Sequence, residues 1–187
     1  MKNLFVFVLM ILLFGCTPEN PTPNPPPTPT IAIGQSYQGG KIAYILQAGD
    51  IGYDANVQHG LIAAPSDQGT IHWGCYFAIS GAEGEAIGTG AQNTIDIMNG
   101  CSEAGTAARL CGDLVLGGYS DWFLPSRDEL WKMYYNKLAI GGFANNGYWS
   151  SSEFEQFDAW YIEFEDGYWG GYGKGNGNFY VRAVRSF

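Results

Sequence analysis

Positive charge is scarce in this chain. Its 187 residues include nine Lys and Arg against eighteen Asp and Glu, and removal of an N-terminal leader containing Lys2 would leave a net charge of −10. A surface with such an excess of carboxylates repels nucleic acid, heparin-like polymers and anionic lipid. We therefore expect no nucleic-acid partner.

Histidine is scarcer still, with only His59 and His72. Neither has partners at a spacing typical of a catalytic triad, and His72 with Cys75 supplies two metal ligands where a structural zinc site needs four. The short Gly-Thr-Gly segment at 88–90 lacks the lysine and the strand–turn–helix setting of a phosphate-binding loop. We expect a protein that is not an enzyme and needs no cofactor.

Long hydrophobic runs are missing as well. The apolar run at positions 4–14 is too short to cross a bilayer as a helix, but it suits the core of a signal peptide. It leads into Leu-Phe-Gly-Cys at 13–16, which fits a lipobox; an ordinary signal peptide cleaved near Gly15 is the alternative. We predict that residues 1–15 are a lipoprotein signal peptide and that Cys16 is acylated with a fatty acid such as palmitate.

The segment after Cys16 has almost no apolar residues. Positions 18–30 contain seven prolines, a composition that favours extended polyproline II and cannot pack a core. Residues 16–30 are therefore predicted to be a spacer that holds the following domain roughly 40 Å from a membrane. A docking ligand for a partner's groove is the alternative. The expected location is the cell envelope, as an outer-membrane lipoprotein exposed at the surface.

Residues 31–187 have the length of one domain with its own core. Glycine and aromatic residues are abundant there while long helical periodicities are few, which is typical of short strands and many turns. We predict early strands at 41–46 and 61–64, helices at 91–98 and 102–114, and a final strand at 180–186. Strands first, helices next and hairpins last indicate an α+β fold.

A third helix is predicted to start after Ser126. Ser126 and Glu129 have the spacing of a capping box, in which each side chain binds the other residue's backbone N–H. The predicted apolar stripe of this helix consists of Leu130, Met133, Tyr134 and Leu138.

Three cysteines remain in the predicted domain. An exported protein meets an oxidising environment, so one disulfide and one unpaired thiol are expected. If the helix at 102–114 is continuous, Cys101 and Cys111 lie roughly 15 Å apart, beyond disulfide reach. Cys75 then pairs with one of them, and Cys101 is the preferred partner.

Three sequence blocks carry a resemblance to a known family. Gly-Tyr-Ser-Asp-Trp-Phe-Leu-Pro-Ser-Arg-Asp-Glu-Leu at 118–130 is followed by Tyr-Trp-Ser-Ser-Ser-Glu at 148–153 and Val-Arg-Ala-Val-Arg at 181–185. Residues 34–187 thereby resemble the Lcl C-terminal domain family, a domain of unknown function found at the end of bacterial collagen-like adhesins. The resemblance implies a C-type-lectin-like fold, with short helices packed on a small, twisted, mainly antiparallel sheet. We assign a structural role to the motif residues Asp121, Trp122, Leu124, Pro125, Glu129, Trp149, Trp160 and Arg182.

The resemblance leaves the ligand open. Collagen-like adhesins of the family are associated with sulfated glycans, which the negative charge of this chain would repel. Sugar-binding C-type lectins hold Ca²⁺ through Glu-Pro-Asn and Trp-Asn-Asp signatures, and the predicted domain contains neither. Glu153, Glu155 and Asp158 are nevertheless candidate Ca²⁺ ligands, with a solvated acidic face as the alternative.

The strongest candidate binding residues lie near the C-terminus, where twelve aromatic residues fall between Tyr148 and Tyr180. Alternation predicts a strand at 160–165, and Asp-Gly at 166–167 predicts a hairpin turn after it. The rings beyond that turn are expected in glycine-rich loops, where they are hard to bury and offer large contact area at low side-chain entropy. The predicted ligand-binding residues are Tyr168, Trp169, Tyr172, Asn176 and Phe179.

These features favour a lipid-anchored envelope protein whose lectin-like domain serves adhesion by binding a glycan or a protein. Exposure of the rings would support binding, whereas full burial would support a structural or assembly lipoprotein without an external ligand. A further alternative is the variable protein of a diversity-generating retroelement, because rewriting of such binding faces favours Asn and Tyr.

Overall fold

The computed structural model describes residues 31–78 and 80–187, so the predicted signal peptide, Cys16 and the proline-rich spacer lie outside the described residues. Ile31–Phe187 forms a compact unit. Its elements in chain order are β1 Ser36–Tyr37, β2 Gly40–Ile45, β3 Gly60–Ala63, β4 Gly69–Ile71, α1 Gly90–Gly100, α2 Ala107–Gly112, α3 Arg127–Tyr135, α4 Lys137–Ile140, β5 Gly147–Glu153, β6 Asp158–Glu163, β7 Trp169–Gly173, β8 Phe179–Val181 and β9 Val184–Ser186.

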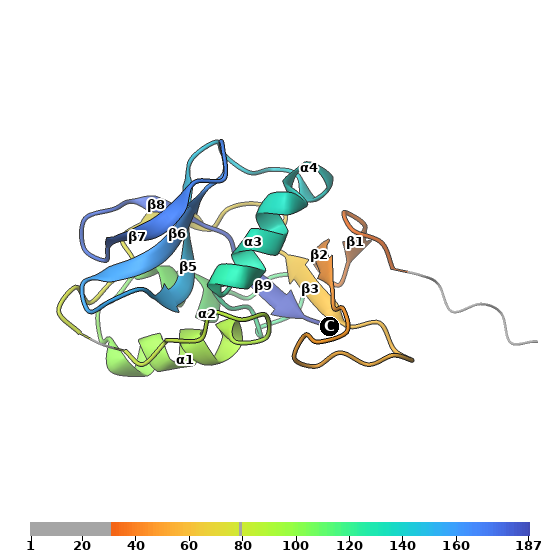
Figure 1. Ribbon diagram of the computed structural model, residues 1–187, viewed down its shortest axis with the longest axis horizontal. Coiled ribbons are helices and arrows are strands. Elements are labelled where there is room, and N and C mark those ends of the chain that lie inside the picture. The colour runs from red at the N-terminus through yellow and green to blue at the C-terminus, as the bar shows by residue number, and fades with distance from the viewer. Residues whose placement is uncertain (1–30, 79) are drawn as a thin grey trace, which may run out of the picture. The chain divides into compact units, whose positions relative to one another are not determined.

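The strands of this unit form two sheets (Figure 1). The first has the order β1-β2-β3-β9 and is antiparallel throughout, so the last strand lies beside the early ones. The second has the order β4-β8-β5-β6-β7, in which β5 and β8 run parallel and the other pairs antiparallel. Short helices beside two mainly antiparallel sheets confirm the predicted α+β class.

α3 links the two sheets, because it contacts β2 of the first and both β5 and β6 of the second. It begins at the predicted capping box: the Ser126 hydroxyl accepts from the Glu129 N–H at 3.3 Å, and a Glu129 carboxylate oxygen accepts from the Ser126 N–H at 2.8 Å. The prediction that Leu138 extends the buried stripe is wrong. α3 ends at Tyr135, and Leu138 in α4 is 93% exposed.

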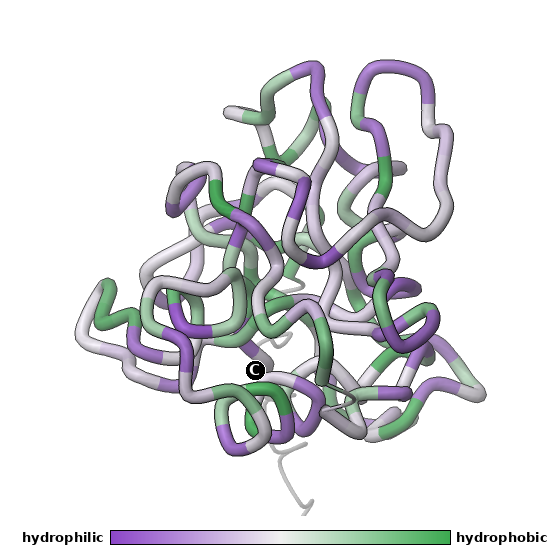
Figure 2. Tube along the Cα trace, turned by 90° about the vertical axis from the view of Figure 1, so that its left-hand side faces the viewer, coloured by the Kyte–Doolittle hydropathy of each residue, from purple (hydrophilic) through white to green (hydrophobic). Residues whose placement is uncertain are grey.

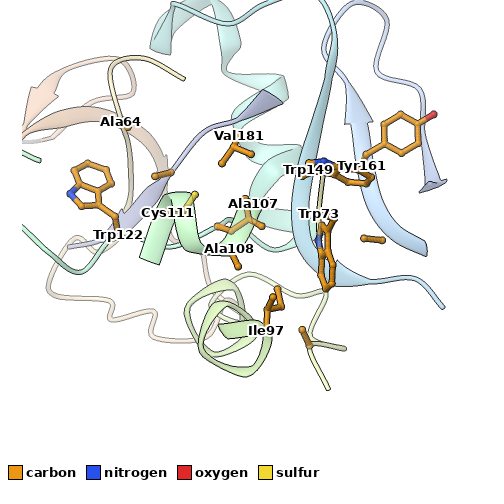
Figure 3. Packing of buried hydrophobic residues seen from close by; sticks show 14 of the residues in the cluster. Ala64, Trp73, Ile97, Ala107, Ala108, Cys111, Trp122, Trp149, Tyr161 and Val181 are labelled. Carbon is orange, nitrogen blue, oxygen red and sulfur yellow. The ribbon is translucent and has the colours of Figure 1, made fainter. Parts of the chain in front are cut away.

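The core contains two clusters. Figure 3 shows the larger one, in which α1 and α2 pack beside the second sheet and contribute Ile97, Ala107 and Cys111 opposite Trp149 and Trp73. The smaller cluster lies between α3 and strands of both sheets; its buried members include Ala43, Leu61, Leu130, Met133, Ile162 and Phe164. Helices thus pack against the inner strands of the second sheet, and β7 lies at its edge.

The predicted helix at 102–114 is too long. Residues 102–106 are not helical, and Gly105 adopts a φ of +68°, which interrupts a right-handed helix. Cys101 instead ends α1, where its N–H donates to the Ile97 carbonyl at 2.8 Å. The distance between Cys101 and Cys111 expected for a continuous helix therefore does not apply. The disulfide nevertheless joins Cys75 to Cys101, as predicted. Cys111 is a buried free thiol.

The predicted final strand at 180–186 is wrong as a single element. β8 belongs to the second sheet and β9 to the first, and the chain crosses between them at Arg182 and Ala183. The Ala183 carbonyl accepts from the Ala64 N–H at 2.9 Å, and its N–H donates to the Gln68 side chain. Ala64 and Gln68 therefore bind the backbone groups of Ala183, which in a continuous strand would pair with a neighbouring strand.

Hydrophobic and hydrophilic residues alternate over short distances along the described chain (Figure 2). This pattern is consistent with many short elements, each with one buried side. None of the described helices combines the length and the apolar character that crossing a membrane requires.

Candidate ligand-binding surface

β6 and β7 form a hairpin at the edge of the second sheet (Figure 1). The turn lies at the predicted Asp166-Gly167, where Gly167 has a φ of +83° and its N–H donates to the Glu163 carbonyl at 2.8 Å. The next ladder bond runs from the Glu163 N–H to the Tyr168 carbonyl at 2.7 Å. The positive φ explains the glycine, because few other residues adopt this conformation without strain.

One face of the hairpin carries a continuous row of aromatic rings. Trp169 on β7 lies 5.1 Å from Trp160 on β6, measured between ring centroids, and 6.3 Å from Trp131 on α3. Trp131 stacks on Tyr135 at 5.3 Å, and Trp160 contacts Phe154 edge-to-face at 4.5 Å. We call this set the tryptophan row; it consists of Tyr135, Trp131, Trp169, Trp160 and Phe154.

The opposite face carries a second set of rings. Tyr172 lies 5.8 Å from Tyr161 and 5.0 Å from Phe179, and Phe179 stacks on Tyr161 at 4.6 Å. Tyr168 lies 6.3 Å from Tyr161. We call these four residues the tyrosine group. Burial of its inner member raises the pKa of Tyr161, with neighbouring Glu163 as a further cause.

The structure separates the predicted ligand-binding residues onto these two faces. Trp169 and Tyr172 belong to β7 itself, so the prediction that they lie in loops is wrong. Tyr168, Trp169 and Tyr172 are exposed by 62%, 46% and 42%, and Asn176 is exposed as well. Phe179 is half-buried against Tyr161 and Trp149, which gives it a packing role.

Sequence reasoning missed Trp131 and Tyr135, which extend the tryptophan row onto α3. The two residues are four apart in the sequence and therefore share one side of the helix. Tyr135 is 71% exposed, whereas Leu130 and Met133 are buried on the other side. An aromatic pair opposite the apolar stripe of a predicted helix was the signal that could have revealed them.

The hairpin is also strongly negative. None of the ion pairs among the described residues includes the five carboxylates of the hairpin and of the turn before it, which are Glu155, Asp158, Glu163, Glu165 and Asp166. Partial burial and the neighbouring carboxylates of Asp166 and Glu165 raise the pKa of Glu163. A hollow of about 340 Å³ beside Phe154 is lined by further acidic residues, among them Glu83 and Glu85. The surface therefore combines exposed rings with five carboxylates that lack an ion-pair partner among the described residues, although Arg127 pairs with Glu85 beside Trp160.

The structure places the candidate Ca²⁺ ligand Glu153 in a buried ion pair. Its carboxylate is buried and lies 2.5 Å from the ammonium of Lys174, and it also accepts from the N–H groups of Ser80 and Gly81. Burial opposes ionisation, but the hydrogen bonds from Lys174 and Ser80 prevail and lower the pKa of Glu153. The Lys174 ammonium and the two backbone N–H groups therefore occupy the oxygens that would have to bind Ca²⁺.

The other two candidate Ca²⁺ ligands, Glu155 and Asp158, lie at the β5–β6 turn. Their turn is closed by backbone bonds, in which the Glu155 N–H donates to the Asp158 carbonyl at 3.2 Å. Within the described residues, the one group of three side chains with metal-binding proximity consists of Cys75, Cys101 and Glu103. Because the two cysteines share a disulfide, this group offers no thiolate ligand.

The motif residues form the framework behind the surface. Asp121 makes a two-point ion pair with Arg185, with both N–O distances 2.7 Å, and Arg182 pairs with Asp67 at 2.6 Å. The Trp149 indole is buried and donates to the Ile71 carbonyl at 2.9 Å. The segment that leads into α3 contributes two further buried side chains, Trp122 and Leu124. The next residue, Pro125, joins this segment to β5, because its carbonyl accepts from the Ser151 N–H at 2.7 Å.

Glu129 and Trp160 hold the loop that precedes α1 against this framework. One Glu129 oxygen accepts from the Gly88 N–H at 2.8 Å and the other from the Ser126 N–H. Burial raises the pKa of Glu129 to about 7, against the opposing effect of these hydrogen bonds. Half-buried Trp160 donates from its indole to Glu85 at 2.9 Å, so it serves both the framework and the tryptophan row.

These observations define an α+β domain with an aromatic, acidic sheet edge. Residues 66–185 match the Lcl C-terminal domain, and since this match covers more than half of the chain, the protein belongs to that family. The family assignment made from the three sequence blocks is confirmed. No curated protein matches the chain.

Proposed function

We propose that this protein is a cell-envelope lipoprotein whose Lcl C-terminal domain binds an external ligand, a glycan or a protein, at the β6–β7 hairpin. In this proposal Cys16 carries the lipid anchor in the outer membrane, and residues 17–30 hold the domain away from it. The C-type-lectin-like character of the fold and a role in adhesion are parts of the same proposal.

The observation that carries the proposal is the exposure of Tyr168, Trp169 and Tyr172 at one sheet edge. Large aromatic side chains bury 150–250 Å² each when they are covered, so leaving three of them in water forgoes considerable stabilisation. Clustered exposed rings are typical of binding surfaces rather than of a monomer's ordinary surface. Full burial would have supported a purely structural lipoprotein.

The proposal includes no catalysis. His72 pairs with Glu103 at 2.7 Å, and His59 contacts the Phe187 carbonyl at 3.2 Å. The strongly perturbed acid, Glu129, is buried in the capping box and accepts bonds from backbone N–H groups. These contacts support a structural role for the two histidines and Glu129.

A glycan array and a peptide array, each probed with and without Ca²⁺, test the proposal directly. Hits should be lost in the double variant Trp169→Ala/Tyr172→Ala while its melting temperature stays close to that of the wild type. The matched control is Tyr53→Ala/Val115→Ala, which removes two exposed apolar side chains elsewhere. Blank arrays would instead favour a structural or assembly lipoprotein without an external ligand, and equal loss in both variants would contradict the assignment of the site to the hairpin.

A further inference from the structure

β7 has backbone groups available for pairing on its outer side. It is the last strand of its sheet, and its pairing with β6 is in continuous register from Asp158↔Gly173 to Ile162↔Trp169. Because the bond between Glu163 and Tyr168 fixes the alternation of the ladder, the backbone N–H and C=O groups of Trp169 and Gly171 point away from β6. Within the described chain no strand pairs with that side.

This edge lacks the features that usually protect edge strands. Natural edges are blunted by lysine, proline or bulges, which hinder the addition of another strand. β7 reads Trp-Gly-Gly-Tyr-Gly and has none of them. The lysine that follows, Lys174, points inward and is fully buried against Glu153. The outer side of β7 is therefore open to a partner strand.

Aromatic rings flank the open backbone on both faces. The Phe154 ring lies over Gly171, where a Cβ would come within 2.3 Å of it, and Trp169 lies on the same face. The Tyr168 hydroxyl lies 3.8 Å from the position of a Cβ at Gly170, on the other face, which Tyr172 shares. An added strand would place alternate side chains against the two sets of rings.

The negative charge of the hairpin determines which kind of strand can pair with β7. Glu163, Glu165 and Asp166 lie at the turn end of the hairpin, and Asp158 and Glu155 lie at the other end. A second copy of the chain would bring the carboxylates of two hairpins close together and be repelled. A segment rich in Lys and Arg would instead be attracted and would supply the missing counter-charges.

We propose that β7 binds an extended basic polypeptide segment by strand addition, with main-chain bonds at Trp169 and Gly171 and side chains held between the aromatic rings. Main-chain pairing supplies affinity in this mode and the flanking pockets supply selectivity. The inference rests on the proposed function, because it names the ligand class of the same surface.

The test uses the full-length protein in mild detergent and a synthetic peptide of about ten residues, a strand's length, in which lysine and valine alternate. Hydrogen exchange at individual amides is the readout. The Trp169 and Gly171 amides should exchange rapidly in the free protein and become at least roughly tenfold slower with the peptide bound. The same peptide methylated on alternate backbone nitrogens should give no protection.

Charge variants complete the experiment. Glu155→Gln/Glu165→Gln removes two carboxylates whose side chains make no hydrogen bond within the described residues, and it should weaken peptide binding about tenfold. Asp54→Asn/Asp113→Asn, on other loops, is the matched control and should leave the affinity unchanged. A glutamate–valine peptide should not bind.

The outcomes separate the two proposals. Equal binding of the methylated peptide, or binding without amide protection, would overturn strand addition in favour of simple charge attraction. Glycan binding that depends on Trp169 and Tyr172, without any peptide binding, would also overturn it while leaving the proposed function intact. Absence of every ligand, with no effect of the Trp169→Ala/Tyr172→Ala variant, would overturn both.

Discussion

Lys174 and Glu153 form a buried ion pair, with 2.5 Å between the ammonium nitrogen and a carboxylate oxygen. The ammonium also donates to the carbonyls of Ala78 and Gln156 at 3.1 and 2.9 Å. These bonds fasten the end of β7 to the β5–β6 turn and to the loop that follows Cys75. The pair is a structural link at the base of the candidate binding surface.

Loss of one partner of this pair should destabilise the protein strongly. Lys174→Met leaves the Glu153 carboxylate buried without its counter-charge, which typically costs about 3–5 kcal/mol. The double variant Lys174→Met/Glu153→Gln removes both charges and should recover part of that loss. Urea unfolding of the two variants and the wild type measures the difference. Equal stability of the two variants would show that the charge pair is not the important interaction.

Calcium should not stabilise the domain. Ca²⁺ needs six to eight oxygen ligands, and the Glu153 carboxylate is already held by Lys174 and two backbone N–H groups. Calorimetry in calcium buffer and in chelator should give the same melting temperature. A clear increase with Ca²⁺, absent with Mg²⁺, would reveal a site that the side-chain geometry does not indicate.

Stability should have a pH optimum in the mildly acidic range. Burial raises the pKa of Glu129 from 4.5 to about 7, so between these values the folded protein binds a proton that the unfolded chain does not. Stability from this group therefore falls as the pH rises from 4.5 to 7, by up to about 1.4 kcal/mol per pH unit. At lower pH the opposite holds for Asp121, whose pKa is lowered by the hydrogen bond from Arg185.

The neutral variant Glu129→Gln isolates this contribution. Glutamine has one acceptor oxygen where two are used, so the variant should be less stable at pH 5. Its stability should also lack the decrease between pH 5 and 7. Melting temperatures of the wild type and the variant at several pH values provide the measurement. Parallel curves for the two proteins would contradict the assignment to Glu129.

Local signals predicted much of the fold because they depend on neighbours in the sequence. The capping box of Ser126 and Glu129 and the turn at Asp166-Gly167 are of this kind. Arg182 is different: its partner Asp67 lies 115 residues earlier, and that contact accompanies the crossing from β8 to β9. No pattern near Arg182 contains this information.

The candidate site, like the fold, was predictable only where it depends on neighbouring residues in the sequence. Composition identified the exposed rings Tyr168, Trp169 and Tyr172, because aromatic residues beside glycine are hard to bury. Their division between two faces follows from the register of β6 and β7, which depends on the pairing in the sheet. The ion pair of the predicted calcium ligand Glu153 joins residues 21 apart in the sequence, with both strands of the hairpin between them.

The two aromatic faces distinguish a strand ligand from a flat one. A bound strand directs alternate side chains to both faces, so Trp169→Ala and Tyr172→Ala should each lower the affinity for the lysine–valine peptide about tenfold. Tyr135→Ala, at the α3 end of the tryptophan row, should leave that affinity unchanged, as titration calorimetry can measure. A ligand that stacks along the row would give the reverse pattern, sensitive to Tyr135 and indifferent to Tyr172. Because Tyr135 is 71% exposed, its replacement tests binding with little effect on the fold.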